Sequence, residues 1–282
     1  MAEDLTWLLG GLLGLLLGSF LNVVIYRLPK MLERQWAEEL ARAQAHHQQP
    51  HAASEFNLLV PRSSCPHCGQ MIQWQDNIPV LSYLWLKGRC RHCQQTISVR
   101  YPLVELSAGL LCAWSTYQFG LTLTGLAWAG FCLALLSLAL IDWDTTLLPD
   151  DITLPLLWAG LISSASGWTS ISLHQAVWGA IVGYLSLWSI YQAFKLLTGK
   201  EGMGYGDFKL LAALGAWLGW PTLIPLILVA SVLGSVVGIA MKLRRSLREG
   251  MYVPFGPFLA SAGMVMLIWG PSNAWQWLGM TR

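Results

Sequence analysis

The sequence predicts an all-α polytopic membrane protein with about eight transmembrane helices and a small cytoplasmic zinc-binding insert. Two observations lead to this fold class: long uncharged runs separate the charged residues, and nearly all basic residues fall on one side of the predicted membrane. Of the 282 residues, 55% are hydrophobic and 11% are charged, whereas soluble domains carry roughly 25% charged residues. A soluble protein is disfavoured, because its helices would need charged outer faces.

Five stretches of the chain contain no Asp, Glu, Lys or Arg. A membrane-spanning helix needs about 20 apolar residues, so the three longest stretches each have room for two helices joined by a turn. Glycine-containing segments near Gly120, Gly167 and Gly219 are the candidate turns. The stretches are residues 7–26, 106–141, 152–194, 210–241 and 251–280.

The basic residues predict the orientation, because Lys and Arg in short loops stay in the cytoplasm. With the N-terminus outside and eight helices, segments 27–105, 142–151, 195–209 and 242–250 face the cytoplasm. They hold every Lys and Arg except Arg282. We therefore expect both termini on the outer side and the polar insert on the inner side. No nucleic-acid partner is expected.

The expected domain organisation is a first transmembrane helix over 1–26, a cytoplasmic insert over 27–105 and a multi-helix membrane core over 106–282. The insert contains the pairs Cys65-Pro-His-Cys68 and Cys90-Arg-His-Cys93. Two such pairs at this separation are typical of a structural zinc site. Disulfides are disfavoured because cytoplasmic thiols stay reduced.

We expect the four cysteines to bind zinc for structural reasons. A small insert buries little apolar surface, so a metal ion would supply folding energy. Four thiolates also leave no open position for a reactive water molecule. Iron, alone or in an iron–sulfur cluster, is the alternative for a site rich in thiolates.

Acidic residues gather where two predicted helices meet the cytoplasmic boundary. Asp142, Asp144, Asp150 and Asp151 follow the third predicted helix, and Asp207 lies just before the sixth. Acids near a bilayer are costly, which favours a functional role. Two carboxylates from separate segments can share one proton, so that one activates water while the other polarises a scissile carbonyl. The residues alone do not choose between Asp142 and Asp144.

Glycines precede the second acid in the motif Gly204-Tyr-Gly206-Asp207. They allow the backbone to approach a substrate strand closely, and they place the acid at a helix start. We therefore expect Gly204 and Gly206 to support the site. The alternative is that Asp207 is simply an N-cap of the sixth helix. For Asp150 and Asp151, an N-cap of the fourth helix is the favoured interpretation.

These motifs resemble the bacterial prepilin peptidases, which are intramembrane aspartic proteases of the glycine-x-glycine-Asp type. That signature ends at Asp207, and residues 141–150, Ile-Asp-Trp-Asp-Thr-Thr-Leu-Leu-Pro-Asp, match the first catalytic motif of the family. Segments 18–29 and 100–105 and the two cysteine pairs are also similar. The resemblance spans nearly the whole chain.

The resemblance implies an aspartic endopeptidase of the bacterial inner membrane. Such enzymes remove the leader peptide from type IV prepilins and from pseudopilins of type II secretion on the cytoplasmic face. They also N-methylate the new N-terminal residue, with S-adenosylmethionine as methyl donor. In the family's pattern the catalytic pair falls on Asp142 and Asp207, with Asp144 and Asp150 in support. The four cysteines match the family's zinc ligands.

The sequence does not locate a methyl-donor site, because it lacks the glycine-rich fingerprint of a nucleotide-binding fold. Lys87, Gly88 and Arg89 in the insert are the candidates. The expected partners are prepilins, pseudopilins and the lipid bilayer. Small residues such as Gly10 and Gly14 suit tight helix packing, within the chain or between subunits, so a homo-oligomer stays open.

Two other functions remain as alternatives. Asp-x-Asp clusters near a bilayer can hold magnesium and a lipid pyrophosphate, as in a metal-dependent prenyl or glycosyl transferase. That chemistry normally requires several acids in both clusters, whereas the second cluster here has Asp207 alone. An ion-coupled transporter would carry its acids at mid-membrane in interrupted helices, whereas these acids are predicted at helix ends.

Overall fold

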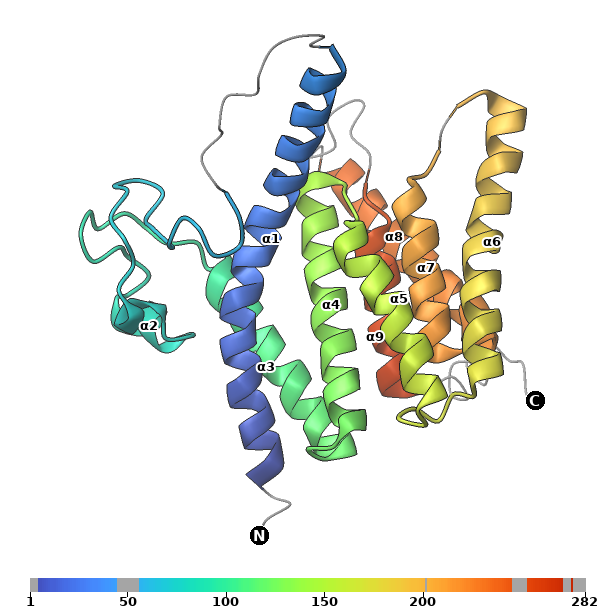
Figure 1. Cartoon of the computed structure of the whole chain (residues 1–282), viewed down its shortest axis with the longest axis horizontal. Coiled ribbons are helices and arrows are strands. Elements are labelled where there is room, and N and C mark those ends of the chain that lie inside the picture. Colours follow the sequence, from blue (N-terminus) through green and yellow to red (C-terminus); the bar gives the residue numbers. More distant parts are fainter. Residues whose placement is uncertain (1–4, 45–55, 201, 245–252, 271–274, 276–282) are drawn as a thin grey trace. The chain divides into compact units, whose positions relative to one another are not determined.

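The computed structural model of the chain describes residues 5–44, 56–200, 202–244, 253–270 and 275. Within them the chain is helical and has no strand beyond two isolated antiparallel bridges (Figure 1). The longer helices are α1 (Thr6–Gln44), α3 (Arg100–Phe119), α4 (Leu123–Thr145), α5 (Asp150–Ala165), α6 (Leu173–Thr198), α7 (Tyr205–Leu218), α8 (Leu223–Leu243) and α9 (Gly256–Trp269). The short ones are η2 (Trp74–Asn77), α2 (Leu81–Trp85) and η3 (Trp220–Thr222).

The long helices form where the uncharged runs predict them. Breaks fall at the three expected turns: α3 ends before Gly120, α5 ends before Ser166 and α7 ends before Gly219. Gly120 and Gly219 have φ angles of 68° and 78°, which glycine adopts without steric cost. Four helical segments are long and apolar enough to cross a membrane: 6–43, 123–145, 173–198 and 220–243. Eight crossings remain a prediction, since the other long helices are shorter or less apolar.

Helix α1 continues well beyond the first uncharged run. It passes through Pro29 and extends to Gln44, so no helix end marks the expected boundary at residue 26. The charged stretch 35–42 is rich in good helix formers, which favours this continuation. The two chain ends, for which the sequence predicts a periplasmic location, lie outside the described residues.

The chain divides into two compact units, residues 1–125 and 126–282. In the first unit, α1 and α3 pack as an antiparallel pair through small residues. A Cβ added at Gly14 would lie 2.6 Å from the carbonyl oxygen of Ala108, and one at Gly18 would lie 2.8 Å from Cα of Glu105. The glycines of α1 therefore serve an internal contact with α3, which removes the main reason to expect them at a subunit interface.

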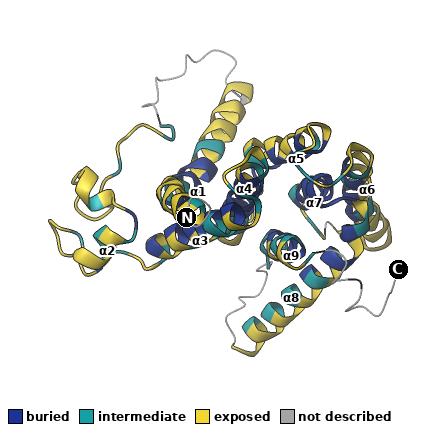
Figure 2. Ribbon diagram, turned by 90° about the horizontal axis from the view of Figure 1, so that it is seen from below, coloured by how far each residue is buried: buried dark blue, intermediate teal, exposed yellow. Residues whose placement is uncertain are grey.

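Helix α7 forms the centre of the second unit, and Figure 2 shows it buried between α5 and α6. Every residue from Leu210 to Leu218 is buried. Gly183 of α6 allows close approach, because an added Cβ would lie 2.7 Å from the carbonyl oxygen of Leu211. The indole N–H of Trp217 donates to the carbonyl oxygen of Leu156 in α5 at 2.8 Å. These contacts fix the position of α7, whose first turn carries Asp207.

Apolar side chains cover the outer faces of two candidate membrane spans. On α6 the exposed residues include Trp178, Ile181 and Leu185, and on α8 they include Val232 and Val236. Such faces are unfavourable in water but suit contact with lipid. The burial pattern therefore agrees with the membrane protein that the sequence predicts.

Candidate active site and metal centre

Asp142 lies near the end of α4 and is buried, with 5% of its surface exposed. The helix ends just after it at Thr145, and the N–H of Thr146, which has a φ of 56°, donates to the carbonyl oxygen of Asp142. The carboxylate oxygen Oδ2 accepts a hydrogen bond of 3.0 Å from the backbone N–H of Gly256. Gly256 is the first residue of α9, and a helix N-terminus favours a nearby carboxylate.

Asp207 lies in the first turn of α7 and is 7% exposed. The N-cap of α7 is Gly204, which has no side chain to cap with, so Asp207 is not the N-cap. Its Oδ1 is buried and has no hydrogen-bond partner among the described residues. Buried polar atoms are nearly always paired in proteins, so an oxygen of this kind indicates a place for a shared proton, a water molecule or a substrate group.

The structure brings Asp142 and Asp207 into one environment. Leu148, in the loop after α4, packs against both helix starts: a Cβ added at Gly206 would lie 2.7 Å from its Cβ, and one at Gly256 would lie 3.2 Å from its Cδ1. The end of α4 and the starts of α7 and α9 therefore meet around two buried carboxylates.

The other acids of the first cluster have different surroundings. Asp144 is exposed, because two residues along a helix turn the side chain by about 200°. Asp150 and Asp151 occupy the first turn of α5. The interpretation of either residue as the N-cap of that helix was wrong: Pro149 holds this position in extended conformation and makes no side-chain cap. Asp150 instead pairs with Lys209 of α7 at 2.7 and 2.8 Å.

The two glycines of the motif have different surroundings. At Gly206 there is no room for a side chain beside Leu148. Gly204 is exposed, and a Cβ there would lie 3.9 Å from Oδ2 of Asp207 as its nearest neighbour. A small residue at Gly204 thus leaves an open approach to Asp207.

The contribution of α9 to the site was not predicted from the sequence. Gly256 supplies the N–H that holds Asp142, although 114 residues separate the two. A Cβ at Gly256 would lie 2.5 Å from Oδ2 of Asp142, so glycine is required for this contact. The segment Pro254-Phe-Gly-Pro257 could have indicated that a helix starts here, because proline is common at a helix start.

The two cysteine pairs form two turns of the same construction. In the first, the N–H of Cys65 donates to the carbonyl oxygen of Gln70 at 2.9 Å, and in the second that of Cys90 donates to Gln95 at 2.9 Å. A residue with positive φ, Gln94 at 58°, follows the second pair, and Gly69 at 71° follows the first. The sequence shows this repeat, because 65–70 and 90–95 both read Cys-x-His-Cys-x-Gln.

The four sulfur atoms converge on one point. All of them lie within 4.8 Å of one another, and Sγ of Cys65 lies 3.8 Å from Sγ of Cys93. A tetrahedral zinc ion with Zn–S bonds of about 2.3 Å would set its sulfurs about 3.8 Å apart. The group can therefore hold a metal ion.

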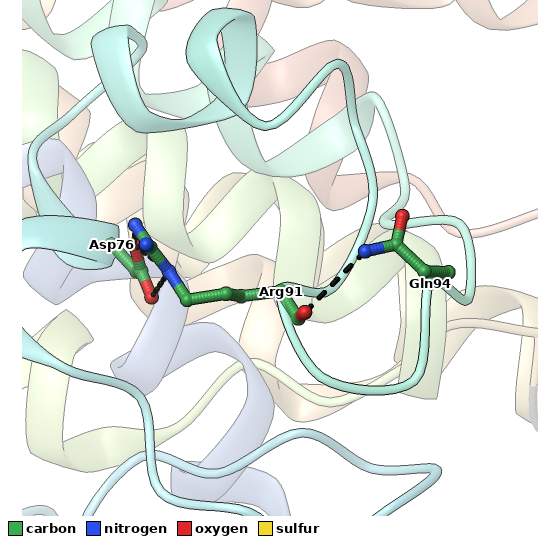
Figure 3. Close-up of polar contacts among 3 residues, drawn as sticks. All are labelled: Asp76, Arg91 and Gln94. Atoms are coloured by element: carbon green, nitrogen blue, oxygen red, sulfur yellow. Dashed lines mark hydrogen bonds and ion pairs between the residues drawn. The ribbon is translucent and has the colours of Figure 1, made fainter.

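Polar contacts stabilise the rest of the insert. Asp76 of η2 accepts hydrogen bonds from Arg91, which lies between the cysteines of the second pair (Figure 3). This ion pair attaches η2 to the metal-binding turn. Lys87 and Arg89 are exposed, whereas Gly88 is buried and a Cβ there would lie 2.8 Å from the hydroxyl oxygen of Tyr83. No described segment adds a nucleotide-binding fold, so Lys87, Gly88 and Arg89 stay a prediction for the methyl-donor site.

Comparison with known proteins identifies the family. Residues 12–119 match the Bacterial Peptidase A24 N-terminal domain, and residues 129–239 match the Type IV leader peptidase family. The chain is 52% identical over 281 residues to the prepilin leader peptidase/N-methyltransferase of Aeromonas salmonicida, covering 96% of this chain and 94% of that protein. It belongs to the type IV leader peptidase family.

Two further relatives of the same name support the assignment. The protein of Stutzerimonas stutzeri is 50% identical over 270 residues, covering 96% of this chain and 93% of its own. That of Pseudomonas aeruginosa is 51% identical over 259 residues, covering 92% and 89%. No solved structure matches the chain. The two family matches separate at nearly the same place as the two compact units, so α3 groups with α1 and the insert.

Proposed function

We propose that this protein is a prepilin leader peptidase and N-methyltransferase of the bacterial inner membrane. Its substrates are type IV prepilins and type II secretion pseudopilins, cleaved on the cytoplasmic face. The observation that carries the proposal is the burial of two carboxylates, Asp142 and Asp207, on separate helices whose ends pack around Leu148. Relatives about half identical over nearly the whole chain carry that name.

In the proposed mechanism, Asp142 and Asp207 share one proton. The ionised carboxylate takes a proton from a water molecule as the water attacks the scissile carbonyl, and the protonated carboxyl group donates its proton to the carbonyl oxygen. The tetrahedral intermediate then collapses, and a proton passes to the departing amine. The N–H of Gly256 holds Asp142 in a fixed orientation, while Oδ1 of Asp207 has no hydrogen-bond partner among the residues that the structure describes and is available to take part.

The proposed roles of the remaining site residues are supporting ones. Gly206 allows close packing beside Leu148, and Gly204 leaves an open approach for the substrate backbone. Asp150 attaches the start of α5 to α7 through Lys209. Asp144 is exposed at the end of α4, at the boundary where we place the basic leader of the substrate.

We propose that a structural zinc ion is bound by Cys65, Cys68, Cys90 and Cys93. Four converging sulfurs fit a closed tetrahedral site. Zinc would cross-link the two turns of the insert and take no part in peptide cleavage. For methyl transfer, S-adenosylmethionine would supply the methyl group, and we assign no step to particular residues.

The proposed membrane topology places the N-terminus, the turns near Gly120, Gly167 and Gly219, and the C-terminus on the periplasmic side. The insert, the two acids and the loops rich in Lys and Arg then face the cytoplasm. This arrangement suits a substrate with a basic leader in the cytoplasm and an apolar stem in the bilayer, because the acids lie where these parts meet.

The test is an assay on the purified protein in detergent or nanodiscs with a prepilin. Mass spectrometry should show loss of the leader and, when S-adenosylmethionine is present, a gain of one methyl group on the new N-terminus. Cleavage should be unaffected by EDTA in the short term. Loss of all activity on removing magnesium, with no prepilin cleavage, would instead favour the prenyl or glycosyl transferase alternative.

A further inference from the structure

The insert is attached to α3 at a strained residue. Val80, directly before α2, has φ 62° and ψ −48°, a conformation that is costly for a β-branched side chain. Its N–H donates to Oε2 of Glu105 at 2.8 Å. Glu105 is 9% exposed and lies in the second turn of α3. The start of α2 is therefore fixed to the side of α3.

The packing of α1 and α3 gives the depth of this attachment. Gly18 of α1 lies opposite Glu105, and the side chain of Asn22 donates to the carbonyl oxygen of Tyr101 at 3.1 Å. By the rise of an α-helix, Gly18 is about 13 Å along the axis from Arg27, where the uncharged run of α1 has ended. Glu105 is likewise about 7–8 Å from Arg100 at the start of α3.

Helix α2 thus begins on the membrane side of the first charged residues of both helices. In Figure 1 it lies beside the first turns of α3, well below the far end of α1. Helices that lie in a membrane interface are buried about 5–10 Å into the boundary between headgroups and acyl chains. The depth of Val80 agrees with such a position.

The surface of α2 has the chemistry of an interfacial segment. Leu84 and Trp85 are 66% and 83% exposed, and Leu81 is exposed beside them. Lys87 and Arg89 follow at once and are also exposed. From residue 77 to 104 the chain has no acidic residue. Exposed tryptophan is typical of the boundary between headgroups and acyl chains. Basic residues beside it favour contact with anionic lipid headgroups.

We infer that residues 81–89, the α2 anchor, bind the cytoplasmic leaflet of the bilayer. Leu81, Leu84 and Trp85 enter the edge of the acyl chains, and Lys87 and Arg89 contact the phosphates of anionic lipids. Because Cys90 follows directly, the anchor holds the metal-binding turns against the membrane surface. The inference rests on the proposed membrane topology and is independent of the peptidase chemistry.

The test measures the depth of residue 85 with a spin label. A ketone-bearing amino acid is introduced at one site and labelled, which leaves the cysteines untouched. Two exposed leucines of α1 serve as references in nanodiscs that contain anionic lipid: Leu12 in the uncharged run and Leu40 in the charged extension. At residue 85 we expect oxygen collisions close to those at residue 12, and collisions with a water-soluble nickel chelate about 5-fold or more below those at residue 40.

Nickel collisions at residue 85 equal to those at residue 40 would overturn the inference. Low collisions with both reagents would also overturn it, since they would mean that protein covers the segment. A second variant set, Lys87→Gln with Arg89→Gln, should raise nickel collisions at residue 85 at least about 2-fold in anionic nanodiscs and leave them unchanged in neutral ones. An equal effect in both lipids would refute the headgroup contact. A single peak in size-exclusion chromatography and an unchanged thermal unfolding temperature would show that these variants fold.

Discussion

The two chemical features of the molecule, the acid pair and the cysteine group, are held in place by different kinds of contact. Asp207 lies in the first turn of α7, a helix that is buried along nearly its whole length between α5 and α6 (Figure 2). In the insert, by contrast, most side chains between residues 56 and 99 are exposed. Its contacts are mostly polar: they include the four sulfurs, the Asp76–Arg91 ion pair, the hydrogen bond from Val80 to Glu105 and the hydrogen bond from Arg27 of α1 to the carbonyl oxygen of Asn57.

This difference shows which interactions hold the residues of each site in position. The positions of the two acids depend on tight helix packing. A single methyl group added at a glycine of these helices would collide with backbone atoms or with a carboxylate. The insert has too little buried apolar surface to be rigid in that way, so its order should depend on the metal ion and a few polar bonds. Variants should therefore separate the two regions, and the following predictions test that separation in order of expected effect.

The largest effect should come from the acid pair. Asp142→Asn or Asp207→Asn should each lower kcat for leader removal by about 10³-fold or more, because residues that act as one unit cannot work singly. The metal content of the insert should not change. Asp151→Asn is the matched control: this residue is exposed in the first turn of α5, and kcat should stay within a few-fold of wild type. Near-normal turnover in either Asn variant would refute the pair as assigned.

A large effect is also expected from Gly256→Ala. The new Cβ would lie 2.5 Å from Oδ2 of Asp142 and would move the carboxylate. A shift of about 1 Å in a catalytic group can cost about 100-fold, so we expect kcat to fall about 10–100-fold with a smaller change in KM. Gly130→Ala is the control, because it lies on α4 with Asp142 and an added Cβ there meets nothing within 4 Å. Equal activity of the two variants would show that the α9 contact does not position Asp142.

Gly256 also shows what sequence could and could not predict. The helices followed from runs of uncharged residues, and their breaks followed from glycines, because both are local properties. The convergence of Cys65, Cys68, Cys90 and Cys93 was predictable for a similar reason, since a repeated motif implies a common ligand. The burial of Asp142 and exposure of Asp144 depend on which face of α4 packs inward, and the bond to Gly256 joins residues 114 apart. Neither is visible in a single sequence.

Loss of the metal site should disorder the insert first and should lower peptidase activity only partly. Cys90→Ser should reduce bound zinc from about one ion per chain to nearly none, because the remaining thiolates no longer form a closed tetrahedral site. Hydrogen exchange should then increase in residues 60–100 before it increases in α7. Cys112→Ser, at a buried cysteine of α3 outside the sulfur group, is the control and should keep its zinc. Iron in freshly purified protein, or zinc retained by the Cys90 variant, would contradict the assignment.

The smallest effect is expected from the ion pair between Lys209 and Asp150, which attaches the start of α5 to α7. Both side chains are partly exposed, at 31% and 52%, and exposed pairs typically contribute about 0.2–1 kcal/mol. Lys209→Met and Asp150→Asn should each lower kcat by no more than about 5-fold, consistent with a coupling of that size. The double variant should be no worse than the worse single one, because both changes remove the same interaction.

A double-mutant cycle on kcat and on thermal unfolding measures this coupling directly. Lys209→Arg preserves the charge and should retain most of the activity, and raised salt should reduce the coupling because partly exposed charges are screened. A different pattern would place Asp150 in another role. If Asp150→Asn abolished cleavage while Lys209→Met were nearly normal, the carboxylate would act on the substrate or on the acid pair itself. Asp150 would then count as a third acid of the site that helix packing holds, beside Asp142 and Asp207.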